Sequence, residues 1–558
     1  MNTLKVAAFD IETEVFDEAK NKHLLNVNFV CGGVVDWNGE EYYFTNLEAM
    51  INWLTQYDVL YVHNSSFDLG VINRAGFQLA DSKIRDTLIM AFLIDENQEI
   101  NLQALSEKYL GEGKTEKIKD GFVPQAACEL TKKYVLNDAR LTLKLGLLFS
   151  SELQNLGAED LFLKVDMPFR RLMDRATQEG VLVNTKELNN LIEEFTIKVN
   201  TTKDKFLRPP YEVNIASPKQ VGKLLYYFPQ MIPTQKDGKP KTDSKTILSL
   251  PARLLKPEAQ EILEYRKNSK LLNTFLLGLQ NALWEDNCIR PLYNLTIART
   301  GRTSSGGSRK SYPKSFNIQN VTKKNKEVRG LVRVKPNTKM VILDAKELEL
   351  RVLAHYADET KLINTFKNNV DPHTFTAAAL LRVDPKAISS EQRQLGKTLN
   401  YAALYGSTAS GLEFNLQISL EEAHEMLQSF NRWYPGIKNL KRQVSRGLEE
   451  QGYVKSIFGR RRRGPLEERE AFSALVQGTA ADLMKERCVS ALAGGKLDPS
   501  YRLVLQIHDE FAFYVPEEKA YQAAQEIQAA FDAETEHRLV VPILFDVRIS
   551  DSWAKTSC

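Results

Sequence analysis

The first 160 residues of the chain alternate short apolar strands with helical segments, and this alternation restricts the fold more than any other feature of the sequence. Leu4–Phe9, Phe29–Val35 and Val59–Val62 are apolar runs of strand length, and Asn101–Leu110 and Cys128–Phe149 have the spacing of helices. Alternating strands and helices indicate a sheet covered by helices, so we expect an α/β layer fold in this region.

Two further regions follow, each with its own pattern. Residues 161–290 are expected to be mostly helical, because Leu188–Phe206 and Pro257–Trp284 carry spaced apolar positions among many lysines and glutamates. Between them, Pro233–Thr246 is polar and rich in turn-forming residues, which predicts an exposed loop. Residues 291–558 mix apolar strands with helical segments, so the sequence as a whole predicts a multidomain α/β protein.

Length and composition agree with several globular domains. The 558 residues correspond to three or four domains of about 150 residues each. Hydrophobic residues make up 43% and charged residues 26% of the chain, which is ordinary for folded proteins, and the net charge of +3 predicts no particular partner. The five cysteines are scattered and form no C-x-x-C pair, so neither a disulfide framework nor a zinc knuckle is expected. The sequence has no apolar run of about 18 residues and no signal-type leader, and we therefore expect a cytoplasmic protein without a membrane partner.

Two acidic side chains on the first strand form the first candidate site. Asp10 and Glu12 are two residues apart and therefore face the same side of a strand. Taken alone, this pair is equally consistent with two solvated acids. Asp68, which lies beside a bulky aromatic after a buried strand, and the i,i+4 pair of Tyr134 and Asp138 on one helical face favour a functional site.

Four acids with a phenol are suited to metal-assisted hydrolysis of a phosphodiester. Mg²⁺ takes oxygen ligands, and two such ions need several carboxylates. A pair of ions would generate hydroxide and stabilise the leaving oxygen, while Tyr134 would hold the attacking water.

A second acidic set occurs in the C-terminal region. Asp344 ends a short apolar strand, and Asp509 and Glu510 lie at the tight tip between the strands Leu503–Ile507 and Phe511–Val515. Asp at a hairpin tip is by itself more typical of a turn residue than of a catalytic one. That interpretation leaves unexplained why two apolar strands present a His-Asp-Glu sequence at so tight a tip.

The predicted helix Gln392–Tyr405 carries Arg393, Lys397, Tyr401 and Tyr405 at every fourth position. Each step of four residues turns about 400° around the helix, so the four side chains form one slowly winding stripe. Two cations followed by two aromatic rings would contact phosphates and then stack on a base. A solvated basic face is the usual alternative for an Arg–Lys pair, but it fits less well on a helix rich in Ala and Leu.

The N-terminal acids, in their order, spacing and neighbouring residues, resemble the DEDD-type 3′–5′ exonucleases of the tyrosine-containing branch. Asp86-Thr87 also matches a recurring element of that family. The resemblance implies an RNase H-like exonuclease domain over residues 1–160. Its metal ligands would be Asp10, Glu12, Asp68 and Asp138, with Tyr134 beside them.

The C-terminal motifs resemble those of family A DNA polymerases, the DNA polymerase I family. They are the run Asp344–Arg351, the helical stripe together with Asn400, and His508-Asp509-Glu510. Weaker marks of the family are Thr300–Ser305, Phe316–Asn320, Asp371–His373 and Gln477–Asp482. The resemblance covers essentially the whole chain and implies a right-hand polymerase. The thumb and the start of the palm would occupy residues 161–330, and the palm and fingers residues 331–558, with the fingers at about 361–440.

The same resemblance implies roles for individual residues. Asp344 and Asp509 would hold two Mg²⁺ ions, with Mn²⁺ as a substitute and Glu510 as a secondary acid. The triphosphate would be held by Arg393, Lys397 and His373; Tyr401 would pack against the incoming sugar and base, Tyr405 would abut the templating pair, and Glu349 would fill the space of a ribose 2′-OH.

Partners and DNA contacts follow from the resemblance as well. Arg302 and Gln477 would touch minor-groove atoms at the primer end. The primer and active site would be supported by Arg351, Asn317, Gln319, Asn320 and His508. The implied partners are primer–template DNA and dNTPs, for a monomeric enzyme whose processivity factor the sequence does not identify.

Basic segments agree with a nucleic-acid path. Lys and Arg dominate residues 299–335, where Glu327 is the only acid, and Arg460–Arg463 form a second basic cluster. Because the exonuclease motif begins at residue 10, we expect a bacteriophage-type enzyme with no 5′-nuclease domain, located in the host cytoplasm.

Departures from the family pattern leave the metal ligands intact. Ala345, Lys346 and Glu347 replace the usual Tyr-Ser-Gln, and Tyr401 stands where many relatives have Phe, which resembles variants that accept dideoxynucleotides readily. A nuclease with a DNA-gripping, non-synthetic C-terminal half and a non-catalytic DNA-binding scaffold are alternatives that the retained acids oppose. A single-subunit RNA polymerase is a further alternative, which Glu349 and the exonuclease motif oppose.

Overall fold

The computed structural model describes residues 4–15, 27–113, 124–226, 234, 238, 241–250, 254–306, 316–405, 408–416 and 418–554. The chain divides into two compact units. The larger unit comprises Met1–Gly180, Arg290–Gln319 and Lys335–Asp551, and the smaller comprises Val181–Ile289, Asn320–Val334 and Ser552–Cys558. In the described ranges, no helix combines the length and the apolar character needed to cross a membrane. The four cysteines in these ranges are free thiols.

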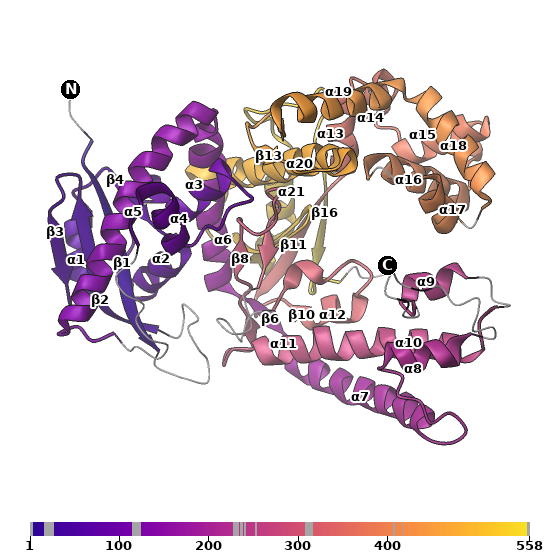
Figure 1. Cartoon of the computed structure of the whole chain (residues 1–558), viewed down its shortest axis with the longest axis horizontal. Coiled ribbons are helices and arrows are strands. Elements are labelled where there is room, and N and C mark those ends of the chain that lie inside the picture. The colour runs from indigo at the N-terminus through magenta and orange to yellow at the C-terminus, as the bar shows by residue number, and fades with distance from the viewer. Residues whose placement is uncertain are drawn as a thin grey trace. The chain divides into compact units, whose positions relative to one another are not determined.

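The larger unit begins with a mixed five-stranded sheet in the order β3-β2-β1-β4-β5. β1 pairs antiparallel with β2 and parallel with β4. The strands are β1 (Val6–Val15), β2 (Val27–Asp36), β3 (Glu41–Phe44), β4 (Val59–Val62) and β5 (Ile84–Asp86). The helices of this N-terminal domain are α1 (Leu47–Leu54), α2 (Ser65–Arg74), α3 (Thr87–Ile94), α4 (Leu102–Leu110) and α5 (Glu129–Leu156) (Figure 1). The α/β layer expected here is therefore confirmed.

A four-stranded antiparallel sheet in the order β14-β15-β11-β16 forms the centre of the rest of this unit. Its strands are β11 (Thr338–Ala345), β14 (Arg502–Ile507), β15 (Glu510–Pro516) and β16 (Phe545–Ser550). The helices packed on it are α6 (Met167–Glu179) and α21 (Ala520–Asp532), and α20 (Glu468–Leu492) contacts both. The apolar runs Leu503–Ile507 and Phe511–Val515 are buried throughout, which explains why they are continuous rather than alternating. Two small ribbons accompany the sheet, β8 (Tyr293–Asn294) with β9 (Ser304–Ser305) and β12 (Tyr453–Lys455) with β13 (Arg461–Arg463).

Helices occupy the sequence between β11 and β12, drawn in orange shades in Figure 1. They are α13 (Leu348–Tyr356), α14 (Thr360–Lys367), α15 (Pro372–Leu381), α16 (Ser390–Leu404), α17 (Ala409–Leu416), α18 (Leu420–Trp433) and α19 (Pro435–Gln451). Local signals set their starts, since Ser389 with Gln392 and Ser419 with Glu422 form capping boxes. The predicted helix Gln392–Tyr405 corresponds to α16.

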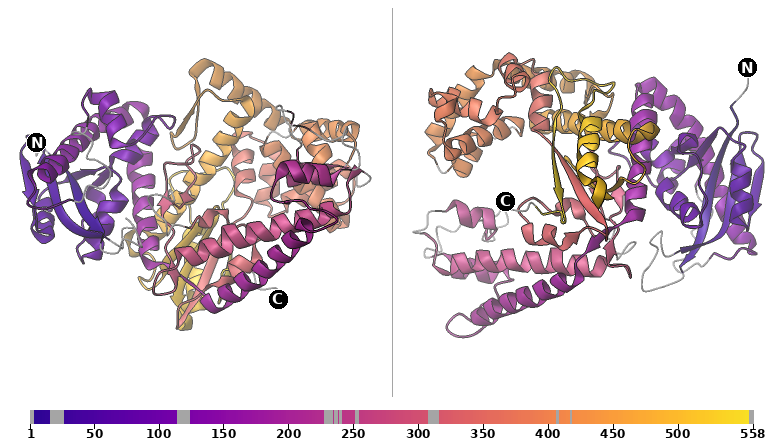
Figure 2. Two further views of the ribbon diagram at one scale, coloured as in Figure 1. Left: turned by 60° about the horizontal axis from the view of Figure 1, so that its bottom comes forward. Right: turned by 180° about the vertical axis from the view of Figure 1, so that it is seen from behind.

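The smaller unit contains long helices that run side by side in Figures 1 and 2. Its helices are α7 (Thr185–Leu207), α8 (Pro218–Leu225), α9 (Ser244–Ser249), α10 (Glu258–Lys270), α11 (Leu277–Ala282) and α12 (Lys326–Leu331), with a π-helical turn, Leu271–Leu276, joining α10 to α11. Its sheet has the order β10-β6-β7, formed by β6 (Val181–Val183), β7 (Cys288–Ile289) and β10 (Val332–Arg333).

The loop predicted over Pro233–Thr246 lies partly outside the described residues, which here are 234, 238 and 241–246. Its last residues are helical rather than looped, because Asp243 caps α9 and accepts a 2.9 Å hydrogen bond from the Thr246 amide. The expected thumb and palm region 161–330 is divided between the two units.

Candidate active sites

Strands β11 and β15 bring the C-terminal acids together. Asp344 lies opposite Glu510 in the antiparallel register, and the Ala345 amide donates a 3.0 Å hydrogen bond to the carbonyl oxygen of Asp509. His508 has a φ of 52°, the left-handed conformation that turns the chain between β14 and β15. The three acids predicted to act together therefore lie at the same end of one sheet.

Gln319 holds the turn that carries Asp509. Its Nε2 donates to the carbonyl oxygen of Gln506 at 2.8 Å, and its Oε1 accepts from the His508 amide at 3.0 Å. Gln506 Nε2 in turn donates to the His508 carbonyl oxygen at 2.7 Å. Asn317 Oδ1 accepts from the amide of Gln319 at 3.1 Å. Asn317, Gln319 and His508, predicted as supports of the primer and active site, thus form a hydrogen-bonded brace at the acidic turn together with Gln506, for which the sequence predicted no role.

Helix α16 carries the two cations and Tyr401 of the predicted stripe, and Tyr405 directly follows its last residue. The rings of Tyr401 and Tyr405 are nearly parallel, with centroids 6.1 Å apart and an interplanar angle of 12°. Burial raises the pKa of Tyr401 to about 12, and the negative charges of Glu349, Asp509 and Asp344 add to that rise. Tyr405 also contacts Glu349 in the first turn of α13, the helix that follows β11, so this end of the stripe lies beside the acidic end of the sheet.

Glu349 is buried, with 7% of its surface exposed, and both of its carboxylate oxygens have partners. Tyr405 Oη donates to Oε2 at 2.7 Å, and Arg302 forms an ion pair with Oε1. Burial, followed by the charge of Glu349, raises the pKa of the Tyr405 hydroxyl above its ordinary value. These contacts fix the carboxylate from two sides.

Arg393 is held by the carboxylate of Asp371, for which the sequence predicted no role. Its Nε and Nη2 donate to Asp371 Oδ2 and Oδ1 at 2.9 and 2.8 Å, the fork geometry of a strong charge-assisted pair. Asp371 also caps α15 by accepting from the Thr374 amide at 2.7 Å. The sequence signal for this cap was the Asp before Pro372, a typical helix start.

Gly396 allows α15 and α16 to approach closely. A Cβ at this position would lie 2.1 Å from the carbonyl oxygen of His373. The close approach places the His373 ring 5.9 Å from the ring of Tyr401, centroid to centroid, and Asn400 Nδ2 lies 3.1 Å from His373 Nδ1. Asn400, which the sequence predicted only as part of the motif, thus orients the imidazole.

His373 is neutral at pH 7. Burial lowers its pKa to about 4, and the charges of Arg393 and Lys397 act in the same direction against the opposing charge of Asp371. A neutral imidazole offers one donor and one acceptor nitrogen beside the two cations.

The remaining residues predicted to contact or support DNA occupy different environments. Arg351 is buried, and its Nε and Nη1 donate to the carbonyl oxygens of Lys346 at 2.7 Å and Pro542 at 2.6 Å. Gln477 is half-buried on α20. Asn320 is exposed and belongs to the smaller unit. Because Arg351 donates to the Lys346 carbonyl oxygen, it supports the backbone that follows Asp344.

The N-terminal acids come from three neighbouring elements. Asp10 and Glu12 lie on β1, with side chains on the same face. The amide of Ile11 between them donates a 3.1 Å hydrogen bond to Asp68 Oδ1. Asp68, in the first turn of α2, is therefore held against β1.

Helix α5 lies against the same part of the sheet. Gly33 pairs with Asp10 in the register of β1 and β2, and a Cβ at Gly33 would lie 2.9 Å from the carbonyl oxygen of Val135. Tyr134 and Asp138 lie one turn apart on this part of α5, and Asp138 is only 3% exposed. The four acids and the phenol predicted to form one site thus lie on elements in direct contact.

Asp86 organises the approach of α2 to this site. Its carboxylate accepts hydrogen bonds from the amides of Asn64 at 3.0 Å, Ser65 at 2.8 Å and Leu88 at 2.9 Å. These contacts fix the starts of α2 and α3. The Asp86-Thr87 element therefore acts by positioning the helix that carries Asp68.

The acids of both sites supply oxygen donors, which suits Mg²⁺. Burial raises the pKa of Asp68 well above its ordinary value, and the charges of Asp86 and Glu12 raise it further, so a cation would relieve both effects. In the part of the chain that the structure describes, no three Asp, Glu, His or Cys side chains already converge as a metal-binding group. The residue types at both sites nevertheless fit the ion.

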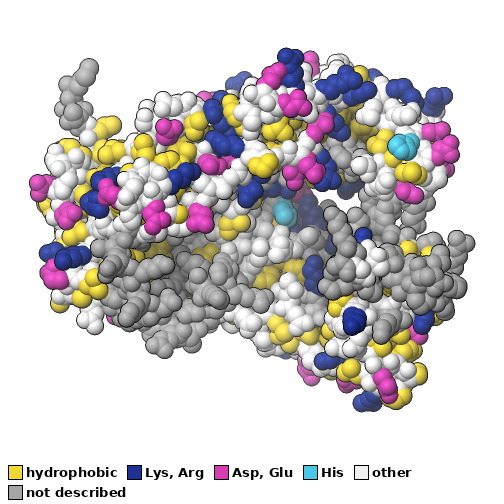
Figure 3. Space-filling model, viewed as in Figure 1, with side chains coloured by type: hydrophobic (Ala, Val, Ile, Leu, Met, Phe, Trp, Pro, Cys, Tyr) yellow, Lys and Arg dark blue, Asp and Glu magenta, His cyan; other side chains and the backbone are white. Residues whose placement is uncertain are grey.

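The basic cluster Arg460–Arg463, predicted to lie on the DNA path, is instead paired within the protein. Arg460 is buried, and its Nη2 lies 2.8 Å from carboxylate oxygens of both Asp482 and Asp166. Two of the following arginines pair with Glu96. Buried guanidinium groups need such partners, and the pattern along the sequence could not identify acids so far away. On the visible face, basic and acidic side chains are interspersed rather than separated (Figure 3).

Proteins of similar sequence match most of this chain. The family model described as DNA polymerase family A matches residues 185–555. DNA polymerase I of Treponema pallidum (strain Nichols) is 28% identical over 532 residues, which cover 90% of this chain and 51% of that protein. The thermostable DNA polymerase I of Thermus thermophilus is 31% identical over 417 residues, covering 70% of this chain and 48% of that protein. The chain thus spans about half the length of the curated relatives it matches.

A solved structure has the same fold over nearly the whole chain. It is the POL domain of Pol1 from M. smegmatis, in complex with DNA primer-template and dNTP, with a TM-score of 0.84. The match covers 99% of this chain and 96% of that one at 23% sequence identity, so the likeness concerns the fold. The expected multidomain α/β architecture is thereby confirmed.

Proposed function

The chain belongs to DNA polymerase family A, and on that premise we propose that it is a template-directed DNA polymerase that adds deoxynucleotides to a primer 3′ end. The observation that carries the proposal is that Asp344, near the end of β11, and Asp509, in the turn before β15, lie at one sheet end. Tyr405 of the basic and aromatic stripe contacts Glu349 in the helix that follows β11. The mycobacterial polymerase of the same fold was solved with primer-template DNA and dNTP, and we propose these as the substrates here.

The triphosphate is assigned to Arg393, Lys397 and His373. The two cations attract phosphate oxygens, and the neutral imidazole of His373 adds a hydrogen-bond donor without a further charge. Asp371 keeps the Arg393 guanidinium oriented before the nucleotide arrives. The ring of Tyr401 then packs against the incoming sugar and base, next to the parallel ring of Tyr405.

Asp344 and Asp509 are assigned as the residues that would hold two Mg²⁺ ions, with Glu510 beside them. When bound, the ions would lower the pKa of the primer hydroxyl and offset the charge that develops on the α-phosphate. The chain's own contribution is positional. β11 and β15 place the two acids at one sheet end, and Gln319 keeps the turn before Asp509 from moving.

Selection of deoxynucleotides is assigned to Glu349. Its carboxylate is held by Tyr405 and Arg302, so it would occupy the space of a 2′-OH and lose partners if displaced. Arg302 and Gln477 are proposed to contact the primer end through minor-groove atoms, where purines and pyrimidines present similar acceptors.

We assign 3′–5′ proofreading hydrolysis to an RNase H-like N-terminal domain. The contacts of α2 and α5 with β1 support this assignment, because they gather the acids of three elements on one side of the sheet. Asp10, Glu12, Asp68 and Asp138 would hold the metal ions, and Tyr134 would orient the water. The bacteriophage type, monomeric state and location of the enzyme stay predictions.

Separate disabling of the two sites tests the proposal. Asp344→Ala and Asp509→Ala should each abolish extension of a labelled primer in Mg²⁺ while leaving digestion of single strands intact, and the double substitution Asp10→Ala with Glu12→Ala should do the reverse. Asp551→Ala is the control, since this 67% exposed acid follows the far end of β16. Extension at the unmodified rate by either variant of the sheet acids would reject the assignment, and a wild-type chain that digests but never extends would favour a nuclease that merely grips DNA.

A further inference from the structure

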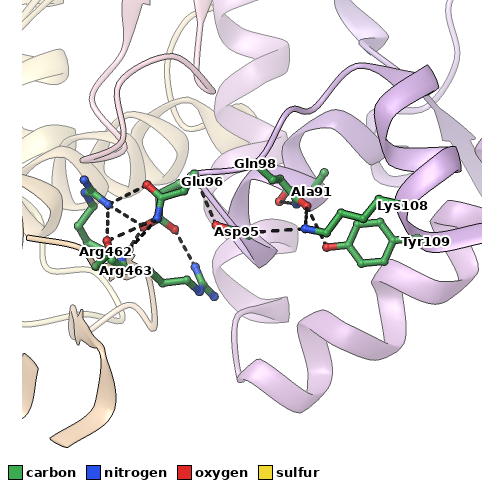
Figure 4. Close-up of polar contacts among 10 residues, drawn as sticks. Ala91, Asp95, Glu96, Gln98, Lys108, Tyr109, Arg462 and Arg463 are labelled. Carbon is green, nitrogen blue, oxygen red and sulfur yellow. Dashed lines mark hydrogen bonds and ion pairs between the residues drawn. The ribbon is translucent and has the colours of Figure 1, made fainter. Parts of the chain in front are cut away.

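A buried acid of the N-terminal domain is paired with arginines far along the chain. Glu96 follows α3, and its side chain is only 2% exposed. Its carboxylate oxygens lie 3.1 Å from Arg462 Nη1 and 2.7 Å from Arg463 Nη1 (Figure 4). The neighbouring Asn97 Oδ1 accepts from Arg462 Nη1 at 3.2 Å. A buried carboxylate with a guanidinium on each oxygen is a specific contact, because either partner alone would be costly to bury.

The segment that contains Arg462 and Arg463 also contacts the C-terminal end of α5 in the N-terminal domain. Arg461 Nη2 donates to the carbonyl oxygen of Leu156, the last residue of α5, at 3.2 Å. A Cβ at Gly459 would lie 2.6 Å from the carbonyl oxygen of Gly157, so the two backbones touch. The ribbon of β12 and β13 therefore contacts the C-terminal end of the helix that carries two of the proposed exonuclease residues.

The residue before β13 ties this ribbon to the proposed polymerase site. Arg460 is paired with Asp482 of α20. A Cβ at Gly301 would lie 2.6 Å from Arg460 Nε, and the next residue, Arg302, forms the ion pair with Glu349. One short segment thus connects the N-terminal domain with the surroundings of Glu349.

We propose that Glu96, Arg462 and Arg463 form a latch that sets the geometry between the two sites and thereby governs transfer of a primer end from synthesis to proofreading. This inference rests on the proposed function. A primer end that stays on one molecule reaches the second site at a rate set by effective concentration, which a fixed arrangement of domains raises. Glu96 is accordingly a positioning residue.

Loosening the latch leaves the exonuclease acids in place. Leu156, where the ribbon meets α5, is about 27 Å along the helix from Asp138. Asp10 and Asp68 are held by contacts within the N-terminal domain, such as the hydrogen bond from the Ile11 amide. Hydrolysis of a free single strand, which needs no transfer, is therefore expected to persist when the latch is broken.

Glu96→Gln tests the latch, because it keeps the side-chain size and removes the charge. Three reactions of the full chain are compared: digestion of a single-stranded oligonucleotide, extension of a matched primer, and excision of a terminal mismatch during one binding event, with unlabelled DNA as a trap. We expect the first two to be unchanged and the third to fall on the order of tenfold. Asp95→Asn is the matched control, since this neighbouring acid pairs with Lys108 at 3.9 Å inside the N-terminal domain (Figure 4).

Arg463→Gln removes the partner from the other side and should reproduce the same selective loss. An equal fall in single-strand digestion and mismatch excision would overturn the latch, because Glu96 would then support the fold of its own domain. Unchanged mismatch excision in both variants would overturn it as well. If the unmodified chain digests no single strand, the proposed exonuclease function fails. Failure of that function is thereby distinguished from failure of the latch.

Discussion

The hydroxyl of Tyr405 donates a 2.7 Å hydrogen bond to Oε2 of Glu349, and Arg302 is paired with the other oxygen of that carboxylate. Tyr405 follows α16 and Glu349 lies in the first turn of α13, so the contact joins two helices that meet beside the acidic sheet end. If this buried carboxylate moved aside for an extra hydroxyl, it would lose both partners. We expect this restriction to act on the sugar of the incoming nucleotide.

Replacing Glu349 by Ala should therefore weaken discrimination against ribonucleotides. We expect the ratio of ribonucleotide to deoxynucleotide incorporation to rise on the order of a hundredfold, because the space for a 2′-OH opens. Single-nucleotide extension, with kcat/KM determined for each nucleotide, measures the ratio. Tyr405→Phe is the matched comparison: it keeps the ring and removes the hydrogen bond, so its effect should be smaller. A ratio unchanged in the Glu349 variant would exclude this residue as the source of sugar selection.

Tyr401→Phe should raise discrimination against dideoxynucleotides. The substitution removes one hydroxyl and keeps the ring that lies 6.1 Å from Tyr405, centroid to centroid, so stacking on the nucleotide persists. A dideoxynucleotide lacks the 3′-OH, so with Phe at position 401 the site holds one polar group fewer near the sugar. We expect discrimination against dideoxynucleotides to rise on the order of tenfold. Competition between each dideoxynucleotide and its normal counterpart measures it, and equal incorporation ratios for the two proteins would reject this role for Tyr401.

The elements that carry both sites were predictable because their signals are local. β4 occupies Val59–Val62 as expected, and α16 differs from the expected Gln392–Tyr405 only at its ends, where the capping box of Ser389 sets the start. Apolar spacing, turn residues and caps act over a few neighbouring residues, so they can be read from the sequence.

Pairing between distant residues was not predictable in the same way. The run Arg460–Arg463 has the composition of a DNA-binding cluster, yet Asp166 and Glu96 neutralise three of its members inside the fold. Asp371 likewise gave no sign that it would hold Arg393. Such contacts depend on which elements the completed fold brings together, and a single sequence does not contain that information in its local pattern.

Asp166 should contribute stability that depends on pH. Burial raises its pKa, but the attraction of Arg460 and Lys485 outweighs burial and leaves the pKa below its ordinary value. Because the pKa is lower in the folded protein, this contribution is complete above the unfolded-state value of about 4 and is lost as the pH falls below it. Asp166→Asn should cost about 3–5 kcal/mol at pH 7, since two buried cations lose a partner, and less at pH 3.

Urea unfolding followed at several pH values measures the effect of Asp166→Asn. Asp160→Asn serves as the control, because this acid pairs with Lys164 at an exposed position and should leave the unfolding midpoint unchanged. A destabilisation of Asp166→Asn that stays constant from pH 7 to pH 3 would contradict the assigned ion pairs, since loss of packing alone does not depend on protonation.

Gly396→Ala should impair nucleotide binding while sparing the N-terminal domain. The added Cβ would lie 2.1 Å from the carbonyl oxygen of His373, so α16 must move away from α15 and carry Arg393 and Tyr401 with it. We expect a loss of stability of about 1–3 kcal/mol from overpacking and a higher KM for dNTPs, with unchanged digestion of single strands. Gly447→Ala is the matched control: its Cβ would meet no atom within 4 Å on α19, so the better helix propensity of Ala should stabilise the protein by about 0.5–1 kcal/mol. Equal KM values for the Gly396 variant and the wild type would show that the spacing between α15 and α16 does not set the nucleotide site.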